Sequence, residues 1–170
     1  IKARIKKSLK VTVSAGVAPN KFLAKVASDW NKPDGVFTVA PDQVDEFVLA
    51  LPVGKINGVG KVTAGKLHEM GVQTCGDLQS VPLDELLQRF GKYGNRLSEV
   101  ARGIDTREVT SSRTRKSISV ERTFSEDIEG ISAVVEAMNT LVGELESRYK
   151  KIDQHYVPVK RFVKIKYRDF

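Results

Sequence analysis

Two glycines one residue apart, with lysines on both sides, are the part of this sequence best suited to chemistry. Gly58 and Gly60 allow a tight turn, and the helix expected to begin just after them directs its unpaired N–H groups back at that turn. The positive end of a helix suits a phosphate that must approach main-chain atoms, and three cations surround it: Lys55, Lys61 and Lys66. The stretch therefore predicts an anion site built mainly from backbone.

The residues that follow predict that the glycines join two helices. Gly71 stands where a helix C-terminal cap belongs, and Thr74 with Asp77 begins a second short helix as a capping box. The unit resembles the helix-hairpin-helix motif, which binds DNA backbone without reading sequence, and residues 57–60 match its glycine-containing core. A Gly-x-Gly before a helix can also be only a tight interhelical turn, so the motif alone leaves both interpretations open.

A second group of cations lies on and just after the helix expected at residues 21–30. Lys21 and Lys25 share one face of that helix, and Lys32 follows seven residues after Lys25, in the turn that ends the helix. Three ammonium groups pointing one way could hold a polyphosphate. They could equally form an ordinary solvated face, and spacing alone does not distinguish the two.

The last residues alternate as a strand with a cationic face. Val163, Ile165 and Tyr167 fall on one side of it. The other side carries only positive charges: Lys160, Lys164, Lys166 and Arg168. Such a face suits a sheet laid along nucleic-acid phosphates, although lysine also guards exposed sheet edges. We favour the phosphate interpretation because no acidic residue interrupts the row.

Composition limits the classes of protein. The chain has 170 residues, 41% of them hydrophobic, with 28 Lys and Arg against 21 Asp and Glu and a net charge of +7. A core can therefore form, and a polyanionic partner fits the charge. The single Cys75 and the isolated His68 and His155 give no zinc spacing and favour a reducing compartment. No signal peptide or spanning segment is present, so we expect a soluble, cytoplasmic protein.

The order of elements predicts an α+β fold in several parts. Helices are expected at residues 1–9, 21–30, 80–90 and 95–101, from residue 41 towards the hairpin, and from about 133 to 149; strands are expected at residues 11–17, 36–39, 116–124 and 159–170. Residues 41–103 form a compact helical unit, and the polar stretch 104–115 is typical of a tether. The chain starts without Met inside a helix and ends inside a strand, so we expect it to be part of a longer protein.

Three stretches in this order resemble the Y-family translesion DNA polymerases. They are Ser14 to Gly35, Gly58 to Gly60, and Arg115 to Phe124, and the similarity extends over essentially the whole chain. The resemblance implies four parts: residues 1–40 as the end of the palm, 41–103 as the thumb with its helix-hairpin-helix, 104–115 as a linker, and 116–170 as the βαβ first half of the little-finger domain.

The resemblance also implies roles for individual residues. Lys32, with Lys25 nearby, would contact the triphosphate of the incoming deoxynucleotide. In the thumb, the amides of Gly58, Val59 and Gly60 and the Thr63 hydroxyl would hold the primer-template backbone, beside Lys61. The little-finger part would bind duplex phosphates through a basic set: Arg115, Lys116, Lys164, Lys166 and Arg168.

One part of the family pattern is missing. Two-metal phosphoryl transfer needs carboxylates that bridge the ions, and in this family they lie upstream of the residues seen here. The adjacent acidic pairs cannot replace them, because residues 45–46 and 84–85 lie on amphipathic helices and residues 126–127 in a turn. We therefore expect the parent protein, a bacterial enzyme associated with the nucleoid, to be a Mg²⁺-dependent DNA polymerase that meets a sliding clamp mostly through other regions. This segment alone would catalyse nothing.

Two other functions remain open on the sequence. A helix-hairpin-helix base-excision glycosylase would need a catalytic Asp after the hairpin, and Asp77 stands at a suitable distance, although it is better explained as a helix cap. A non-enzymatic DNA-binding module would need only the hairpin and the basic strand. Release of a damaged base from a duplex would indicate the glycosylase, and dependence of DNA binding on a nucleoside triphosphate separates the polymerase from the plain module.

Overall fold

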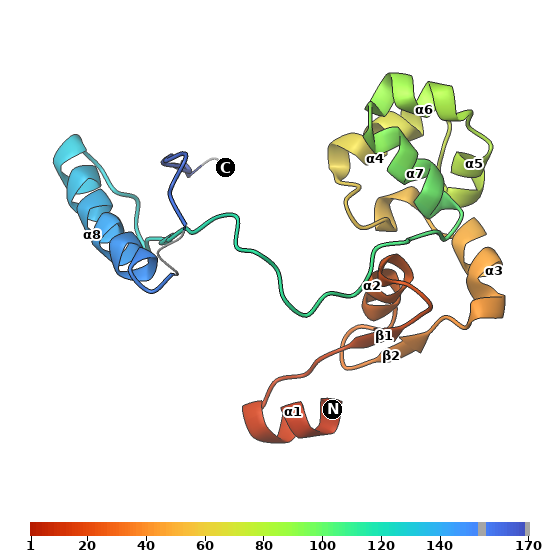
Figure 1. Ribbon diagram of the computed structural model, residues 1–170, viewed down its shortest axis with the longest axis horizontal. Helices are drawn as coiled ribbons and strands as arrows, with labels where there is room; N and C mark the ends of the chain where they lie inside the picture. The colour runs from red at the N-terminus through yellow and green to blue at the C-terminus, as the bar shows by residue number, and fades with distance from the viewer. Residues whose placement is uncertain (153–155, 169–170) are drawn as a thin grey trace. The chain divides into compact units, whose positions relative to one another are not determined.

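The computed structural model describes residues 1–152 and 156–168, which form two compact units, 1–110 and 111–170 (Figure 1). The first unit contains two short strands and most of the helices, and the second contains one long helix with extended chain beside it. The expected α+β class is confirmed. His155, Asp169 and Phe170 lie outside the described residues.

The first unit begins with two parallel strands connected by a helix. β1 (Ala15–Val17) pairs with β2 (Val36–Thr38), and α2 (Lys21–Trp30) lies between them in the chain. β1 is shorter than the β-rich run at residues 11–17 because only residues 15–17 have a partner in β2. Asn20 begins α2, since its side-chain oxygen accepts a hydrogen bond from the Leu23 amide at 3.0 Å.

Residues 41–103 are helical, as expected, and share one core with α2. The elements are two 3₁₀ turns, η1 (Pro41–Gln43) and η2 (Val53–Lys55), and five helices: α3 (Val44–Leu49), α4 (Lys61–Glu69), α5 (Cys75–Gln79), α6 (Leu83–Phe90) and α7 (Tyr93–Ala101). Every one of these helices places at least one residue in the core, including Val48, Leu67 and Leu97, and Phe22 and Leu23 of α2 join them. Burial of these apolar side chains is the main force that holds these helices to α2.

Two local features show why α5 begins and α4 ends where they do. The capping box predicted at Thr74 is formed: the Asp77 amide donates to Thr74 Oγ1 at 3.1 Å, and the Thr74 amide donates to Asp77 Oδ2 at 2.9 Å. Gly71 has φ +79°, a left-handed conformation that glycine adopts readily, and it follows the end of α4.

At Gly94, a Cβ would lie 2.5 Å from the backbone of Leu86, so a side chain there would force α6 and α7 apart.

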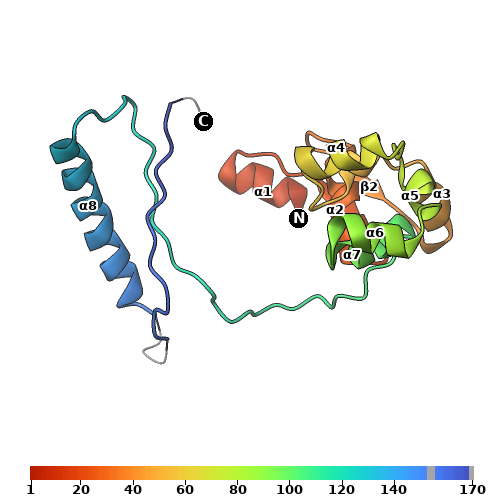
Figure 2. The same cartoon turned by 90° about the horizontal axis from the view of Figure 1, so that it is seen from above.

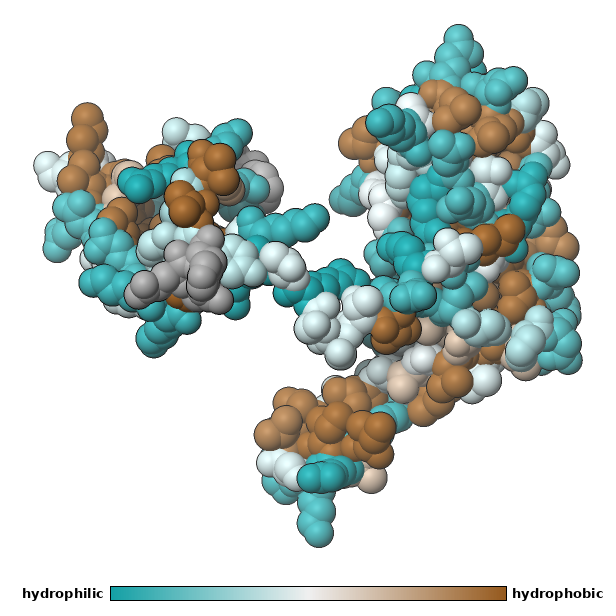
Figure 3. All heavy atoms as spheres, viewed as in Figure 1, coloured by the Kyte–Doolittle hydropathy of each residue, from teal (hydrophilic) through white to brown (hydrophobic). Residues whose placement is uncertain are grey.

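The opening helix, α1 (Lys2–Leu9), buries none of its residues. Ile1 is fully exposed and Leu9 is 67% exposed, and Figure 3 shows apolar side chains gathered on the surface of this helix. Its polar link to the rest of the unit is Asp34, which pairs with Lys2 at 3.2 Å and with Lys6 at 3.0 Å. Ion pairs that remain partly open to solvent contribute little stability, so α1 is only weakly held.

The second unit contains α8 (Ile131–Tyr149), which extends over the helix predicted there. The two flanking segments, 116–124 and 159–168, run extended beside α8 (Figure 2) but have no assigned strand, so the βαβ prediction is wrong in that respect. The alternating pattern predicts an extended chain, whereas a strand also requires ladder hydrogen bonds to a neighbour. In the described ranges 1–152 and 156–168, no helix is both long and apolar enough to cross a bilayer.

Candidate nucleic-acid and nucleotide interface

The hairpin is a compact backbone turn that ends at the first residue of α4. Lys55 donates its amide to the Pro52 carbonyl at 2.9 Å, and Ile56 donates to the Val53 carbonyl at 3.1 Å. Ile56 and Val59 then bury their side chains in the core, at 2% and 9% exposure. The buried side chains fix the turn, and the residues between and after them face outward.

Gly58 and Gly60 differ in whether the backbone conformation requires glycine. Gly58 has φ +102°, a backbone conformation that strongly favours glycine, so the turn itself requires it. Gly60 has φ −87° and ψ 179°, which any residue adopts, and a Cβ added there would meet nothing within 4 Å. The fold therefore does not need glycine at position 60. The open space lies at the N-terminus of α4, where a phosphate would have to approach.

The first turn of α4 supplies donors at this site. Gly60 is the N-cap of α4 and provides no side-chain hydrogen bond, so the amides of the first turn, including Lys61 and Thr63, have no capping partner. The Val59 amide is already committed, since it donates to the Ile56 carbonyl at 2.9 Å. The expectation that the Val59 amide contacts phosphate therefore does not hold for this conformation. Lys61 is exposed and Thr63 is half-buried beside these amides.

Lys25 and Lys32 come together on one carboxylate. Both Nζ atoms pair with Asp29, Lys25 from the preceding turn of α2 and Lys32 from the turn after it. The Lys25 hydrogen bond, followed by that of Lys32, lowers the pKa of Asp29 to about 2. The lysine stripe predicted from spacing is thus a real cluster, but it holds an acidic residue at its centre.

Two features of this cluster differ from the sequence interpretation. Lys21 is not part of it, because its Nζ donates to the Glu108 carbonyl oxygen at 3.0 Å. Asp29 was not among the residues predicted from the lysine pattern. Its spacing, four residues after Lys25 and three before Lys32, is the spacing of ion pairs on a helix face and could have been found in the sequence.

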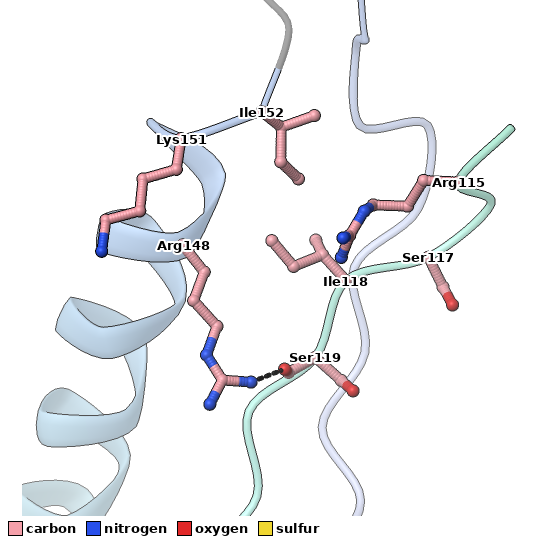
Figure 4. Close-up of a pocket in the computed structure, with 7 residues that line it drawn as sticks. All are labelled: Arg115, Ser117, Ile118, Ser119, Arg148, Lys151 and Ile152. Atoms are coloured by element: carbon pink, nitrogen blue, oxygen red, sulfur yellow. Dashed lines mark hydrogen bonds between the residues drawn. The ribbon is translucent and has the colours of Figure 1, made fainter. Parts of the chain in front are cut away.

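Arg115, one of the basic residues predicted for the second unit, lies at a shallow hollow in its surface. The hollow has a volume of about 470 Å³ and is lined by Arg115, Ser117, Ile118, Ser119, Arg148, Lys151 and Ile152 (Figure 4). The Arg115 guanidinium points into it, Arg148 donates to the Ser119 carbonyl at 2.8 Å, and Lys151 points away. Arg148 therefore ties α8 to the extended segment, while Arg115 remains directed at the open space.

The other predicted phosphate-binding residues of this unit are also at the surface. Lys116, Lys164 and Lys166 are exposed. Arg168 is 89% exposed and lies 3.9 Å from Asp127, a weak ion pair. The alternating apolar residues are exposed as well, Val163 by 65%. These side chains are accessible to a polyanion, but the structure does not gather them into one cluster.

Asp77 is fully engaged in its capping role. Its Oδ2 accepts hydrogen bonds from the Gln73 amide at 3.0 Å, the Thr74 amide at 2.9 Å and the Thr74 hydroxyl at 3.0 Å. The two backbone amides, that of Thr74 first, hold the pKa of Asp77 below its usual range. A carboxylate held in this way is poorly placed to attack or protonate a substrate.

No group of three or more His, Cys, Asp or Glu side chains is close enough to hold a metal ion within residues 1–152 and 156–168. The donor set of the described chain therefore does not fit the two-metal centre that the family pattern implies.

Three family descriptions match successive parts of the chain. Residues 1–29 match the impB/mucB/samB family, residues 54–105 match the thumb domain of DNA polymerase-iota, and residues 115–170 match the C-terminal domain of the impB/mucB/samB family. A solved Y-family DNA polymerase chimera of Dbh and Dpo4 has a similar structure, with a TM-score of 0.74 and 31% identity over 89% of this chain and 43% of that chain. The chain belongs to the Y family of DNA polymerases.

Several curated relatives of the chain are DNA polymerase IV proteins. The DNA polymerase IV of Ectopseudomonas mendocina is 51% identical, that of Ralstonia nicotianae 50% and that of Pseudomonas entomophila 49%. Each similarity covers 100% of this chain and 48% of the relative, so the chain spans about half the length of the curated relatives that it matches. The resemblance to polymerases of the DNA polymerase IV type is confirmed.

Proposed function

We propose that the protein to which this chain belongs is a DNA-directed DNA polymerase that copies damaged template. Within it, the chain binds the primer-template backbone and the triphosphate of the incoming deoxynucleotide. Residues 1–40 act as the end of the palm, 41–103 as the thumb, 104–115 as the linker and 116–170 as the first half of the little finger. The relatives named DNA polymerase IV support the reaction, and the hairpin supports the DNA-binding role.

The observation that carries the DNA-binding role is the open space at Gly60 in front of α4. The amides of the first turn of α4 have no capping partner, and glycine at position 60 is not required by the fold. A phosphate oxygen placed there accepts N–H bonds at the positive end of a helix, and Lys61 adds a charge. These contacts reach only backbone, so binding is independent of base sequence.

The nucleotide role rests on the paired lysines. Lys25 and Lys32 place two ammonium groups on one side of α2, as charge-neutralising contacts to a triphosphate require. In the second unit, Arg115, Lys116, Lys164, Lys166 and Arg168 add phosphate contacts along the duplex.

Catalysis in this proposal belongs to the remainder of the polymerase. Mg²⁺, held by carboxylates outside this chain, would activate the primer hydroxyl and neutralise the triphosphate. The contribution of this chain is to hold the two substrates, and a sliding clamp is contacted mainly by other regions. The work takes place on the chromosome, in the cytoplasm of a bacterial cell.

The first test is fluorescence anisotropy of a labelled primer-template duplex titrated with the chain at several salt concentrations. We expect affinity to fall steeply with salt and to be the same for duplexes of unrelated sequence. The slope against the logarithm of salt counts the phosphate contacts. Absence of binding even at low salt would contradict the DNA-binding role of the hairpin.

A second titration separates a polymerase segment from a plain DNA-binding module. A deoxynucleoside triphosphate complementary to the template should raise the affinity for primer-template, and Lys32→Ala should reduce that increase. A module that only holds DNA shows no such dependence. A glycosylase is disfavoured by the hydrogen bonds on Asp77, and release of a damaged base from a duplex would be needed to restore it.

A further inference from the structure

Asp29 forms ion pairs with the two lysines that the proposed function assigns to the nucleotide. Its Oδ2 pairs with Lys25 and its Oδ1 with Lys32, so each carboxylate oxygen takes one ammonium group. The two lysines thus already hold an anion, and it belongs to the chain itself. A triphosphate that binds them has to share or replace this carboxylate.

We propose that Asp29 is an internal competitor of the triphosphate, which holds Lys25 and Lys32 in the absence of nucleotide and thereby limits the affinity of the site. The inference rests on the proposed nucleotide site, because it concerns the same two lysines. It identifies the residue that sets how tightly a triphosphate is held there.

The alternative is that Asp29 helps binding by holding the lysines in place, and charge decides between the two. All three side chains are largely accessible, with exposures of 48% for Lys25, 58% for Lys32 and 41% for Asp29. Holding two exposed lysines in place adds little binding free energy, because solvent screening and the loss of side-chain entropy weaken exposed ion pairs. A negative charge beside a triphosphate, in contrast, acts against every bound phosphate at short range. Repulsion and competition therefore outweigh positioning.

The surroundings of Asp29 supply a probe. Asp29 lines a hollow of about 240 Å³ together with Val26, Trp30 and Lys55. Trp30 is the only tryptophan of the chain, and its ring packs against Phe37 and Phe47, with centroids 5.7 Å and 5.0 Å away. Displacement of Asp29 changes the charges next to a fixed indole ring, so tryptophan fluorescence reports on the event.

The test is a titration of the chain with inorganic tripolyphosphate, which does not absorb in the range of tryptophan, followed by Trp30 fluorescence at low ionic strength. Calorimetry then measures the affinity for a deoxynucleoside triphosphate. We expect Asp29→Asn to bind about three- to tenfold more tightly than the parent chain, a gain that shrinks as salt is added. Lys32→Ala should weaken binding. The double variant with Asp29→Asn and Lys32→Ala should lose most of the gain in affinity that Asp29→Asn gives alone.

Asp34 offers a matched control. It also pairs with two lysines, Lys2 and Lys6, five residues further along the chain, and Asp34→Asn changes the net charge by the same amount. Its affinity for tripolyphosphate should stay within about twofold of the parent, because its lysines are not those of the site.

The outcomes distinguish the competitor role of Asp29 from the nucleotide site itself. Equal affinity of the parent and Asp29→Asn, or weaker binding by the variant, overturns the competitor role and leaves the nucleotide site standing. An equal gain in Asp34→Asn also overturns it, since the effect is then general charge. If neither the parent nor Asp29→Asn binds tripolyphosphate or nucleotide at low salt, the nucleotide site itself is wrong and the inference falls with it.

Discussion

The side-chain amide of Asn20 donates a hydrogen bond to the Gly103 carbonyl oxygen at 2.7 Å, across 83 residues of sequence. The same side chain accepts the Leu23 amide at 3.0 Å, so one residue caps α2 and holds the chain that leaves α7. Lys21 adds a second attachment through the Glu108 carbonyl. The first turn of α2 and the segment after the helical bundle are therefore parts of one arrangement.

Two substitutions separate these roles of Asn20. Asn20→Ala removes both hydrogen bonds and should lower the free energy of unfolding by about 1–3 kcal/mol. Asn20→Ser keeps a capping oxygen but cannot reach Gly103, so it should lose about 0.5–1.5 kcal/mol. Urea unfolding of the first unit measures both. Equal losses for the two variants would mean that the bond to Gly103 contributes everything and the cap nothing.

Gly60→Val tests the phosphate approach without disturbing the fold. Position 60 has ordinary backbone angles and open space, so thermal unfolding should be nearly unchanged. Affinity for a duplex should fall about tenfold, as expected for the loss of charge-assisted hydrogen bonds, and by the same factor for unrelated sequences. Gly60→Ala should fall between the parent and valine. A loss that depends strongly on sequence would show that the hairpin reads bases.

Gly94→Ala tests the close contact of α6 with α7. The added Cβ would lie 2.5 Å from the Leu86 backbone, so the helices must separate, and the free energy of unfolding should fall by about 2–4 kcal/mol. Gly65→Ala in α4 is the matched control, because its Cβ meets nothing within 4 Å. It should be neutral or stabilise by up to about 1 kcal/mol. A small effect of both variants would contradict the packing described here.

Asp105 should make the first unit sensitive to acid. Its side chain is fully buried and accepts two bonds from Arg107 at 2.8 Å, with Arg96 at 3.3 Å. The hydrogen bonds from Arg107, more than the charge of Arg96, hold the pKa of this carboxyl far below its usual range. Since the pKa is lowered on folding, the contribution is present above the unfolded pKa of about 3.9 and is lost as pH falls below it.

The corresponding measurement compares the parent with Asp105→Asn. At pH 7 the variant should be less stable by about 1–3 kcal/mol, because the two arginines lose the negative charge and one of the two acceptor oxygens. Urea midpoints measured from pH 6 down to pH 3 should converge as the parent loses its advantage. Curves that stay parallel over this range would attribute the loss to packing rather than to charge.

The helical parts of this fold could be predicted because their signals are local. The cap at Asn20, the capping box of Thr74 and Asp77, and the left-handed Gly71 are each specified within a few residues. The segments 116–124 and 159–168 could not be predicted as strands or non-strands, since that depends on neighbours far away in the chain. Their alternation indicated only an extended conformation.

The candidate site was predictable in its cations and less so in its hydrogen bonds. Lys25 and Lys32 were found from helical spacing, but Asp29 between them and the diversion of Lys21 to Glu108 depend on which partner each ammonium reaches. The partner of the Val59 amide is the backbone carbonyl of Ile56. No side-chain type in the sequence indicates such a bond, so the amide could not be recognised as engaged. Side-chain types indicate charge, whereas the geometry of the turn decides which donors remain.

The attachments of residues 103–108 also have a mechanical meaning. They lie in series along the chain: Glu108 is held by Lys21, Asp105 by Arg96, and Gly103 by Asn20. A pull applied at residue 110 loads the bond between Glu108 and Lys21 first, and it loads the bond between Gly103 and Asn20 only after the two outer attachments have broken. The three attachments would therefore break one after another under tension, and the packed core of α2 and α7 would be loaded last.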